Sequence, residues 1–422
     1  MENKSLAAER RRRRRDEVLS LAAERLGSEA AHALDHLYRP YDERLYRYFA
    51  NLWDPVIGGF YYSRSAKENE GFLPDIESTV QAMRCISTVG LYEGRGSLLE
   101  GTPRAMKDAI VRFARSLQSK DDGYFYHPQW GKDITVSRRG RDLSWAVGIL
   151  SDFNEAPLYP TPLDRAQSHE QTTLPPYLCS LSAFREYLSS FEDPESAYYV
   201  RSRSYPMGNL LQSQILQIRA AGEEYVDTMF RWLEAQQLAN GLWEDSCTYA
   251  SVNGLMKISL LYSALGRRMQ HMKEAIARAI ETVRSPIPPN ACVLVYNPWV
   301  VVSSLIGMLQ NGDTDNYRKF RKIITNNAAD MIDVTNQKIT IFRKADGSYS
   351  YCPDHSSATS QGAPVALPGT NEGDVNATSI LASGTLRSMC QGLGIPRIPL
   401  FCQEDGDAFF SMIINTSEAF TV

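Results

Sequence analysis

The stretches FARSLQSKDDGYF, residues 113–125, and WLEAQQLANGLW, residues 232–243, decide the fold. Both finish a helical pattern and continue as Gln-x4-Gly-x-aromatic, and looser copies occur at residues 59–61 and 346–349. Asp-Gly or Asn-Gly ends a helix through a left-handed cap, because glycine adopts positive φ without steric cost. The aromatic residue two positions later can then wedge against the next pair of helices. The repeat therefore predicts a succession of helical hairpins.

The spacing of the repeats sets the number of hairpins. The marker glycines are Gly59, Gly123, Gly241 and Gly347, and the last two gaps are close to twice a unit of roughly 55–60 residues. That leaves room for degenerate copies near residues 197 and 298, which makes six units of two helices each. We therefore predict an all-α chain in which residues 28–422 form a single (α/α)6 toroid with short β or loop insertions. Residues 1–27 are expected to form an Arg-rich helical extension.

Composition narrows the class of protein. The 422 residues carry 45 basic and 49 acidic side chains, a net charge of −4, which argues against a dedicated nucleic-acid binder. Seven dispersed cysteines without a C-x-x-C pair favour a reducing, cytoplasmic location. The apolar tract 291–309 is interrupted by Asn-Pro and Ser-Ser, so we expect a buried helix and no membrane span. The six arginines at 10–15 fit either an anionic partner or a solvated helix start.

Acidic residues recur where the second helix of a unit is expected to begin. Residues 73–79, 141–146 and 373–379 each contain Asp followed by an aliphatic, a polar and small residues. Taken singly, such residues are good helix caps. In a ring of hairpins, however, the inner helices start at one end, so these acids would converge on one mouth. We predict Asp75, Glu77 and Asp142 as catalytic acid or base groups, assisted by His127.

Other residues are expected near the same mouth and would bind substrate. Arginines just before Asp142 could clamp an anionic group by bidentate hydrogen bonds, although a solvated loop is an equal alternative. Most of the aromatic residues could instead be wedges or core residues. The predicted substrate-binding residues are Tyr61, Tyr126, Trp130, Arg139, Arg141, Trp145, Trp243, Asp374 and Asn376.

This pattern resembles the α/α-toroid superfamily over roughly residues 45–385. The glycine-marked repeats look like those of terpenoid cyclases and protein prenyltransferases. The segment Asp75-Ile76-Glu77-Ser78-Thr79 is similar to the Asp-x-Asp-Asp-Thr proton-donor motif of class II terpene cyclases, but Ser78 replaces the last acid. The chain is also too short for the second helical domain that those cyclases usually carry. Both departures count against cyclisation.

A second resemblance concerns a metal. The pair Asp245 and Cys247 looks like the zinc pair of protein prenyltransferase β subunits, and His355 is the histidine nearest a later repeat. Those three ligand types are compatible with zinc. Cys247 could equally be a small buried residue, so no cofactor is expected and the zinc set is the alternative.

The other toroid branch holds glycan-active enzymes, among them uronyl hydrolases, which place two essential Asp residues on neighbouring inner-helix starts. Asp75 and Asp142 would resemble them in position. Aromatic, carboxylate and amide side chains suit sugar rings. The leading hypothesis is thus a glycoside hydrolase or lyase acting by carboxylate acid/base catalysis on an oligosaccharide or uronate. The alternatives are an isoprenoid-active enzyme, with Glu77 as proton donor, and a non-catalytic toroid binding module.

Overall fold

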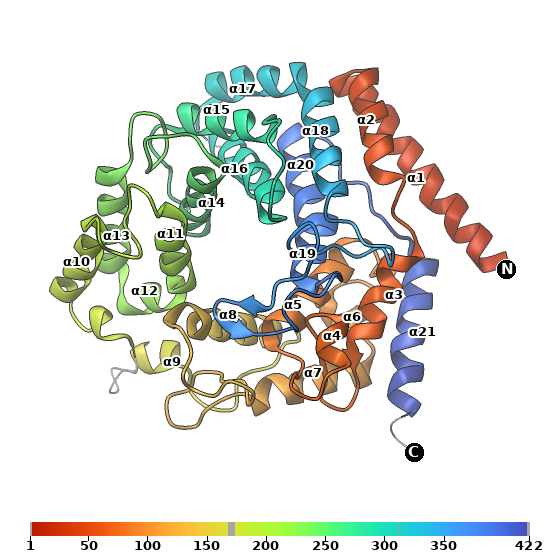
Figure 1. The fold of residues 1–422 in the computed structure, drawn as a ribbon, viewed down its shortest axis with the longest axis horizontal. Coiled ribbons are helices and arrows are strands. Elements are labelled where there is room, and N and C mark those ends of the chain that lie inside the picture. Colours follow the sequence, from red (N-terminus) through yellow and green to blue (C-terminus); the bar gives the residue numbers. More distant parts are fainter. Residues whose placement is uncertain (1, 168–173, 311, 420–422) are drawn as a thin grey trace.

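Helices make up most of the chain. The structure, a computed structural model, describes residues 2–167, 174–310 and 312–419. Figure 1 shows the helices following one another around the molecule, with α1 (Glu2–Leu26) on the outside. The prediction of an all-α chain is confirmed. In the described part, strands occur only as two short antiparallel pairs, β1 (Trp53–Asp54) with β2 (Gly59–Phe60) and β3 (Thr359–Ser360) with β4 (Ala363–Pro364).

One set of helices contacts its neighbours in a closed order. Within the described residues, α5 contacts α8, α8 contacts α11, α11 contacts α14, α14 contacts α16, and α16 contacts the last helical stretch, which returns to α5. We call these the inner helices, and they face the middle of Figure 1. They are α5 (Ile76–Thr88), α8 (Val136–Asp152), α11 (Ser204–Ser213), α14 (Tyr249–Ala264), α16 (Val293–Gln310), and the stretch formed by α19 (Val375–Ser379), a π-helical turn (Ile380–Thr385) and α20 (Leu386–Leu393).

An outer helix precedes each inner one along the chain. The outer helices are α3 (Glu43–Leu52), α7 (Arg104–Ser116), α10 (Leu181–Ser189), α13 (Glu223–Gln236), α15 (Met272–Val283) and α18 (Ala328–Thr340). The other described helices are α2 (Ser28–Tyr38), α4 (Arg64–Lys67), α6 (Leu98–Gly101), α9 (Pro162–Gln167), α12 (Ile215–Ala221), α17 (Thr314–Asn326) and α21 (Gln403–Ala419), with 3-10 turns at Pro176–Leu178 and Ser190–Glu192. Helix α18 packs on α2, and α21 packs on α3 and α7, so the helices near both chain ends lie against outer helices.

Glycine-marked turns join four of the outer helices, α3, α7, α13 and α18, to their inner partners and explain the repeat. Gly241 has φ 85°, and a Cβ placed there would lie 2.3 Å from the backbone nitrogen of Ala275 on α15. A Cβ on Gly347 would lie 2.9 Å from the nitrogen of Leu45 on α3. The turn of the last pair therefore packs on the first outer helix. The copy expected near residue 298 is wrongly placed, because that residue lies inside α16 and the corresponding connection is 284–292.

The repeat aromatics are part of the core. Phe60, Phe125, Trp243 and Tyr349 are all buried. The indole nitrogen of Trp243 donates to the carbonyl of Leu233 on the preceding outer helix, at 3.0 Å. These four aromatic residues pack as wedges between helices. They therefore take the structural role that the sequence offered as the alternative to substrate binding.

The arginine run fixes α1 to the body of the protein. Arg10 pairs with Glu404 at 2.6 Å, Arg11 with Asp405 at 3.3 Å, and Arg14 with Glu93. Because these partners come from α21 and from the loop after α5, the run neutralises acids of the protein itself. Neither an anionic partner nor a fully solvated helix is needed to explain it.

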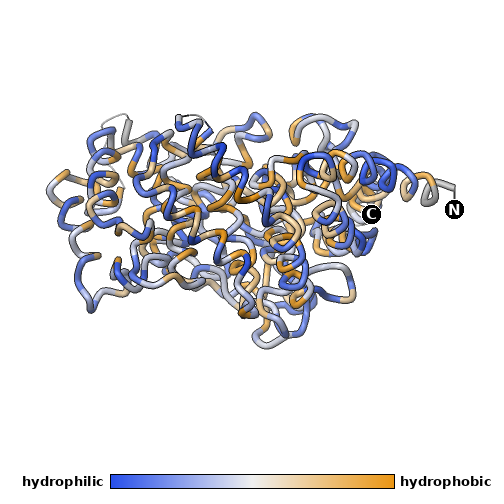
Figure 2. Tube along the Cα trace, turned by 90° about the horizontal axis from the view of Figure 1, so that it is seen from above, coloured by the Kyte–Doolittle hydropathy of each residue, from blue (hydrophilic) through white to orange (hydrophobic). Residues whose placement is uncertain are grey.

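Apolar and polar residues alternate along the helices in the edge view of Figure 2. Among the described residues, α16 alone is long and apolar enough to cross a membrane, and 61% of it is buried inside the protein. Its contacts with α14, α15 and α20 account for that composition, since an inner helix is covered on several sides. This agrees with the prediction of a buried helix.

Candidate functional site

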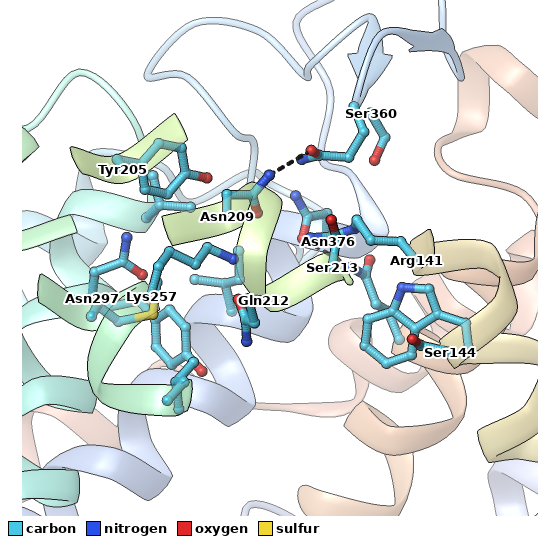
Figure 3. Close-up of a pocket in the computed structure, with 18 of the residues that line it drawn as sticks. Arg141, Ser144, Tyr205, Asn209, Gln212, Ser213, Lys257, Asn297, Ser360 and Asn376 are labelled. Carbon is cyan, nitrogen blue, oxygen red and sulfur yellow. Dashed lines mark hydrogen bonds between the residues drawn. The ribbon is translucent and has the colours of Figure 1, made fainter. Parts of the chain in front are cut away.

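The inner helices surround a cavity of about 730 Å³. Each of them contributes to its wall, together with Ile215 at the start of α12 and residues of the loop 351–361 (Figure 3). The polar side chains in the wall are Gln81, Arg84, Arg141, Ser144, Tyr205, Asn209, Gln212, Ser213, Lys257, Tyr296, Asn297, Tyr351, Ser357, Thr359, Ser360, Gln361 and Asn376. Trp145 and Met256 add apolar surface. A space of this size holds a small ligand or a short oligomer.

The wall is positively charged. Arg84, Arg141 and Lys257 line the cavity, and no Asp or Glu is among the described residues that do so. The nearest carboxylate is Glu77, which lies directly behind the wall and accepts hydrogen bonds from Ser360 Oγ at 3.0 Å and from Arg141. An anionic ligand would therefore meet cations and neutral donors.

Several buried polar atoms of the wall have no hydrogen-bond partner in the described chain: Gln81 Oε1, Arg141 Nε, Trp145 Nε1 and Asn297 Oδ1. Asn297 is only 1% exposed, and its amide nitrogen donates to Asn253 Oδ1 at 2.9 Å, so its oxygen remains free. Buried polar groups are normally paired, and those left over need water or a ligand. The amides and hydroxyls that line the cavity supply donors and acceptors in addition to its charge.

The predicted catalytic acids converge on an arginine rather than on the cavity. Arg138 is fully buried, and its guanidinium donates to Asp75 at 3.0 Å, Glu77 at 3.2 Å and Asp142 at 3.0 Å. Arg141 pairs with Glu77 from the cavity side. None of the three acids lines the cavity. In this arrangement each carboxylate has a charged partner, so the cluster joins α5 to α8 as a buried ion-pair network.

The charges in this network are unequal, since three carboxylates face two guanidiniums. Burial raises the pKa of Asp142 to about 7, against the opposing pull of Arg138. Burial also acts to raise the pKa of Glu77, but Arg141 and Arg138 outweigh it and hold that pKa at about 2. Asp142 is therefore the carboxyl that takes up a proton near neutral pH, while Glu77 stays ionised.

The local structure of the acids differs from the expected helix starts. Asp75 is the N-cap of α5 and accepts from the backbone nitrogen of Ser78 at 3.0 Å, which is the capping role. Asp142, in contrast, lies inside α8, which begins at Val136 with Thr135 as its cap. The expectation that Asp142 starts a helix is wrong, since the helix begins six residues earlier. The (i, i+4) ion pair between Arg138 and Asp142 stabilises this additional helical segment.

His127 is buried and both of its ring nitrogens are occupied. Nε2 lies 2.9 Å from the carbonyl of Pro74, and Nδ1 accepts from the backbone nitrogen of Gln129 at 3.2 Å. Together these bonds require a neutral ring with the proton on Nε2. Burial also lowers the pKa of His127. Its ring stacks on Trp130, whose own ring lies 4.9 Å from the guanidinium carbon of Arg138, so this histidine supports the network.

Of the predicted substrate-binding residues, Arg141, Trp145 and Asn376 line the cavity. The others lie elsewhere. Tyr61 donates a hydrogen bond to Asp54, and Tyr126 donates one to Asp122. The guanidinium of Arg139 lies over the ring of Tyr124, and that of Arg138 lies over the ring of Trp130. Trp243 is a core residue.

Asp374 is buried as the N-cap of α19. It accepts from the backbone nitrogens of Ala377 at 2.7 Å and of Tyr351 at 2.8 Å. Burial raises its pKa to about 7 despite these bonds. It therefore fixes the loop that carries Tyr351 to the start of α19, and only the neighbouring Asn376 reaches the cavity.

The alternative zinc set is not assembled. Cys247 Sγ lies 3.7 Å from Thr282 Oγ1, while His355 Nδ1 lies 2.7 Å from Asp354. Among the residues that the structure describes, no group of three or more His, Cys, Asp or Glu side chains is placed to hold a metal ion.

Lys257 is a cavity residue that the repeat pattern did not predict. It lies in the middle of α14, whose sequence YASVNGLMKISLLYSA is otherwise uncharged. A single lysine inside an apolar helix is a readable signal, since lysine is almost never fully buried without a partner. The repeat motif drew attention to the turns instead, and Lys257 lies two helical turns beyond one.

Comparisons with known proteins add no family to this description. No protein-family model, no curated protein and no solved structure matched the chain. Function is therefore inferred from the cavity itself.

Proposed function

We propose that the ring of inner and outer helices is an (α/α)6 toroid and that its central cavity binds an acidic carbohydrate. The protein would then be a carbohydrate-active enzyme whose substrate contains uronate residues. The closed order of helix contacts supports the toroid, and the turn of the last pair packing on α3 agrees with it. Cytoplasmic location stays a prediction from the cysteine pattern.

The observation that carries the proposal is the composition of the cavity wall. Two arginines, Arg84 and Arg141, line the cavity without a lining carboxylate among the described residues and therefore favour an anion, while amides, hydroxyls and Trp145 match the hydroxyl edges and apolar faces of sugar rings. Arg141 is best placed to hold a carboxylate, because it lines the cavity, its side chain keeps 20% of its surface exposed, and Glu77 fixes one of its nitrogens. A uronate sugar combines both features in one molecule.

Between the two sugar chemistries, the geometry favours a lyase over a hydrolase. Hydrolysis needs two carboxyl groups at the glycosidic bond, but Asp75 and Asp142 are both held by Arg138 behind the wall. Elimination needs a cation that neutralises the uronate carboxylate and a base beside it. Arg141 supplies the cation.

The alternatives are less well supported. Alkene protonation calls for an apolar cavity with an isolated acid, whereas this wall is rich in amides and hydroxyls, and Glu77 is ionised and paired. A non-catalytic binding module would use the same wall for recognition alone. Measurement of turnover separates that alternative from an enzyme.

Calorimetric titration tests the binding step. We expect uronate-containing oligosaccharides to bind, and the same oligosaccharides with their carboxylates reduced to alcohols to bind much more weakly. Arg141→Met should weaken uronate binding about 10- to 100-fold, which is the usual contribution of a hydrogen bond to a charged group. Arg139→Met, on the same helix but outside the cavity, should not. Equal affinity for the charged and the reduced sugar would refute the proposal.

A further inference from the structure

Lys257 is placed in the cavity by close packing of two inner helices. A Cβ on Gly208 of α11 would lie 2.9 Å from Cβ of Lys257, and a Cβ on Gly254 of α14 would lie 1.8 Å from Ser204 Oγ. Only glycine at both positions lets α11 and α14 approach so closely. The stem of Lys257 is thereby buried between the helices, and its amine extends toward Gln212 (Figure 3).

The amine of Lys257 has no acidic partner. In the described chain it makes no hydrogen bond or ion pair, and the ring of Tyr205 lies 5.8 Å from Nζ. A buried ammonium is normally paired, so an unpaired amine is pushed toward its neutral form. Burial lowers the pKa of Lys257 to about 7, helped by the positive charge of Arg141 and opposed by Glu77.

The other lysine that is buried among the described side chains provides the contrast. Lys338 Nζ donates to the carbonyls of Thr282 at 3.2 Å and Val283 at 2.8 Å, at the C-terminal end of α15. That amine has a structural task, the neutralisation of a helix end. Lys257 has none, and it faces the space in which a ligand would lie.

We propose that Lys257 is the catalytic base, taking the proton from the carbon that bears the carboxylate of a uronate residue held by Arg141. This inference rests on the proposed function and extends it to a reaction class, β-elimination. Arg141 stays charged and binds the carboxylate of the uronate. Lys257 is neutral and accepts the proton.

The step balances without any co-reactant. Nζ takes the proton from C5 of the uronate, and the electron pair of that bond forms the C4–C5 double bond. The C4–O bond to the neighbouring sugar breaks, and its electrons go to the departing oxygen. The ammonium formed on Lys257 returns its proton to that oxygen. The products are an unsaturated uronate and a shortened oligosaccharide.

The pH dependence follows from the groups around Nζ. Glu77 stays ionised, with a pKa of about 2. The Glu77 carboxylate raises the pKa of Arg141 in spite of its burial, so that cation persists. Burial raises the pKa of Tyr205 on α11 and of Tyr296 on α16, so both stay neutral. Among these groups only Lys257 changes charge near pH 7, and kcat should rise as pH increases through about 7.

Turnover of uronate oligosaccharides by the full-length chain tests the inference, with formation of the unsaturated product followed by ultraviolet absorption. Lys257→Met and Lys257→Arg should each lower kcat by about 10³-fold, the usual contribution of a general base, while the dissociation constant changes less than tenfold. Lys319→Met, at an exposed position of α17, is the matched control and should leave kcat unchanged. Asp142→Asn should keep the rise of kcat near pH 7, because Asp142 does not line the cavity.

The outcomes separate the two proposals. If the unaltered protein does not bind uronate oligosaccharides, the proposed function fails. If it binds them but forms no unsaturated product, or if either Lys257 variant keeps more than a tenth of kcat, the base role is overturned. Loss of the rise in kcat near pH 7 in Asp142→Asn would assign that proton to Asp142 and would also overturn it.

Discussion

Replacement of Arg138 by methionine tests whether the predicted catalytic acids are a structural network. Methionine fills much of the space but removes the guanidinium that donates to Asp75, Glu77 and Asp142. Removing one partner of a buried ion pair typically costs 3–5 kcal/mol, since the remaining charge is left unpaired. Glu77 would retain Arg141 and Asp142 can bind a proton, so Asp75 is the acid left without compensation. We therefore expect a loss of about 4 kcal/mol at pH 8.

The assay is urea denaturation followed by far-ultraviolet circular dichroism, at pH 8 and at pH 5. The loss should be smaller at pH 5, because the freed carboxyls can protonate there. The matched control is Arg139→Met, the next residue of α8, whose side chain is half-buried over Tyr124 at 4.9 Å. It should cost no more than about 1 kcal/mol. If Arg138→Met were as mild as Arg139→Met at pH 8, the network would not hold the fold and the structural reading of the acids would be refuted.

Three further predictions concern stability. Gly208→Ala should destabilise the protein by about 1–3 kcal/mol, because the added Cβ would meet Lys257 Cβ at 2.9 Å. The control Gly307→Ala, whose Cβ would meet nothing within 4 Å, should be neutral or stabilising by up to about 1 kcal/mol. Equal effects of the two substitutions on the urea unfolding midpoint would contradict the close packing of α11 on α14. Asp142→Asn should gain about 3 kcal/mol of stability relative to the unaltered protein as pH rises from 5 to 8, because a carboxyl whose folded-state pKa is raised to about 7 costs stability once it ionises. A constant difference across that range in thermal unfolding would argue against the raised pKa. Lys338→Met should lower the unfolding midpoint, because it removes two hydrogen bonds to the end of α15. It should leave the affinity for uronate unchanged in calorimetry, and a weakened affinity would show that α15 controls the cavity.

The helical architecture was predictable because its determinants are local. A helix end, a glycine with positive φ and an aromatic wedge lie within a few residues of one another, and Gly123, Gly241 and Gly347 all take the left-handed conformation. Gly59 was a less accurate marker, since the neighbouring Gly58 has the positive φ of 91°. Two units have no glycine turn, those between α10 and α11 and between α15 and α16, and the second of them was misplaced.

The site was harder to predict because its parts come from distant segments. Asp75 and Asp142 were expected to meet, and they do, but the residue that joins them is Arg138, which was read only as one of a group of loop arginines. Nothing in the spacing of acids reveals whether they face a cavity or a buried cation. Lys257 was visible as a lone charge in an apolar helix, yet its position in a ligand cavity depends on how α11 packs against α14.

The most direct test of the central claim is a crystal structure of Lys257→Met with an intact uronate oligosaccharide. We expect the sugar inside the ring, with its carboxylate hydrogen-bonded to Arg141, a ring face against Trp145, and the C5 hydrogen directed toward position 257. The Arg138 network should be unchanged. A sugar bound outside the ring, or inside it with the carboxylate away from Arg141 and Asp142 against the glycosidic oxygen, would contradict the account.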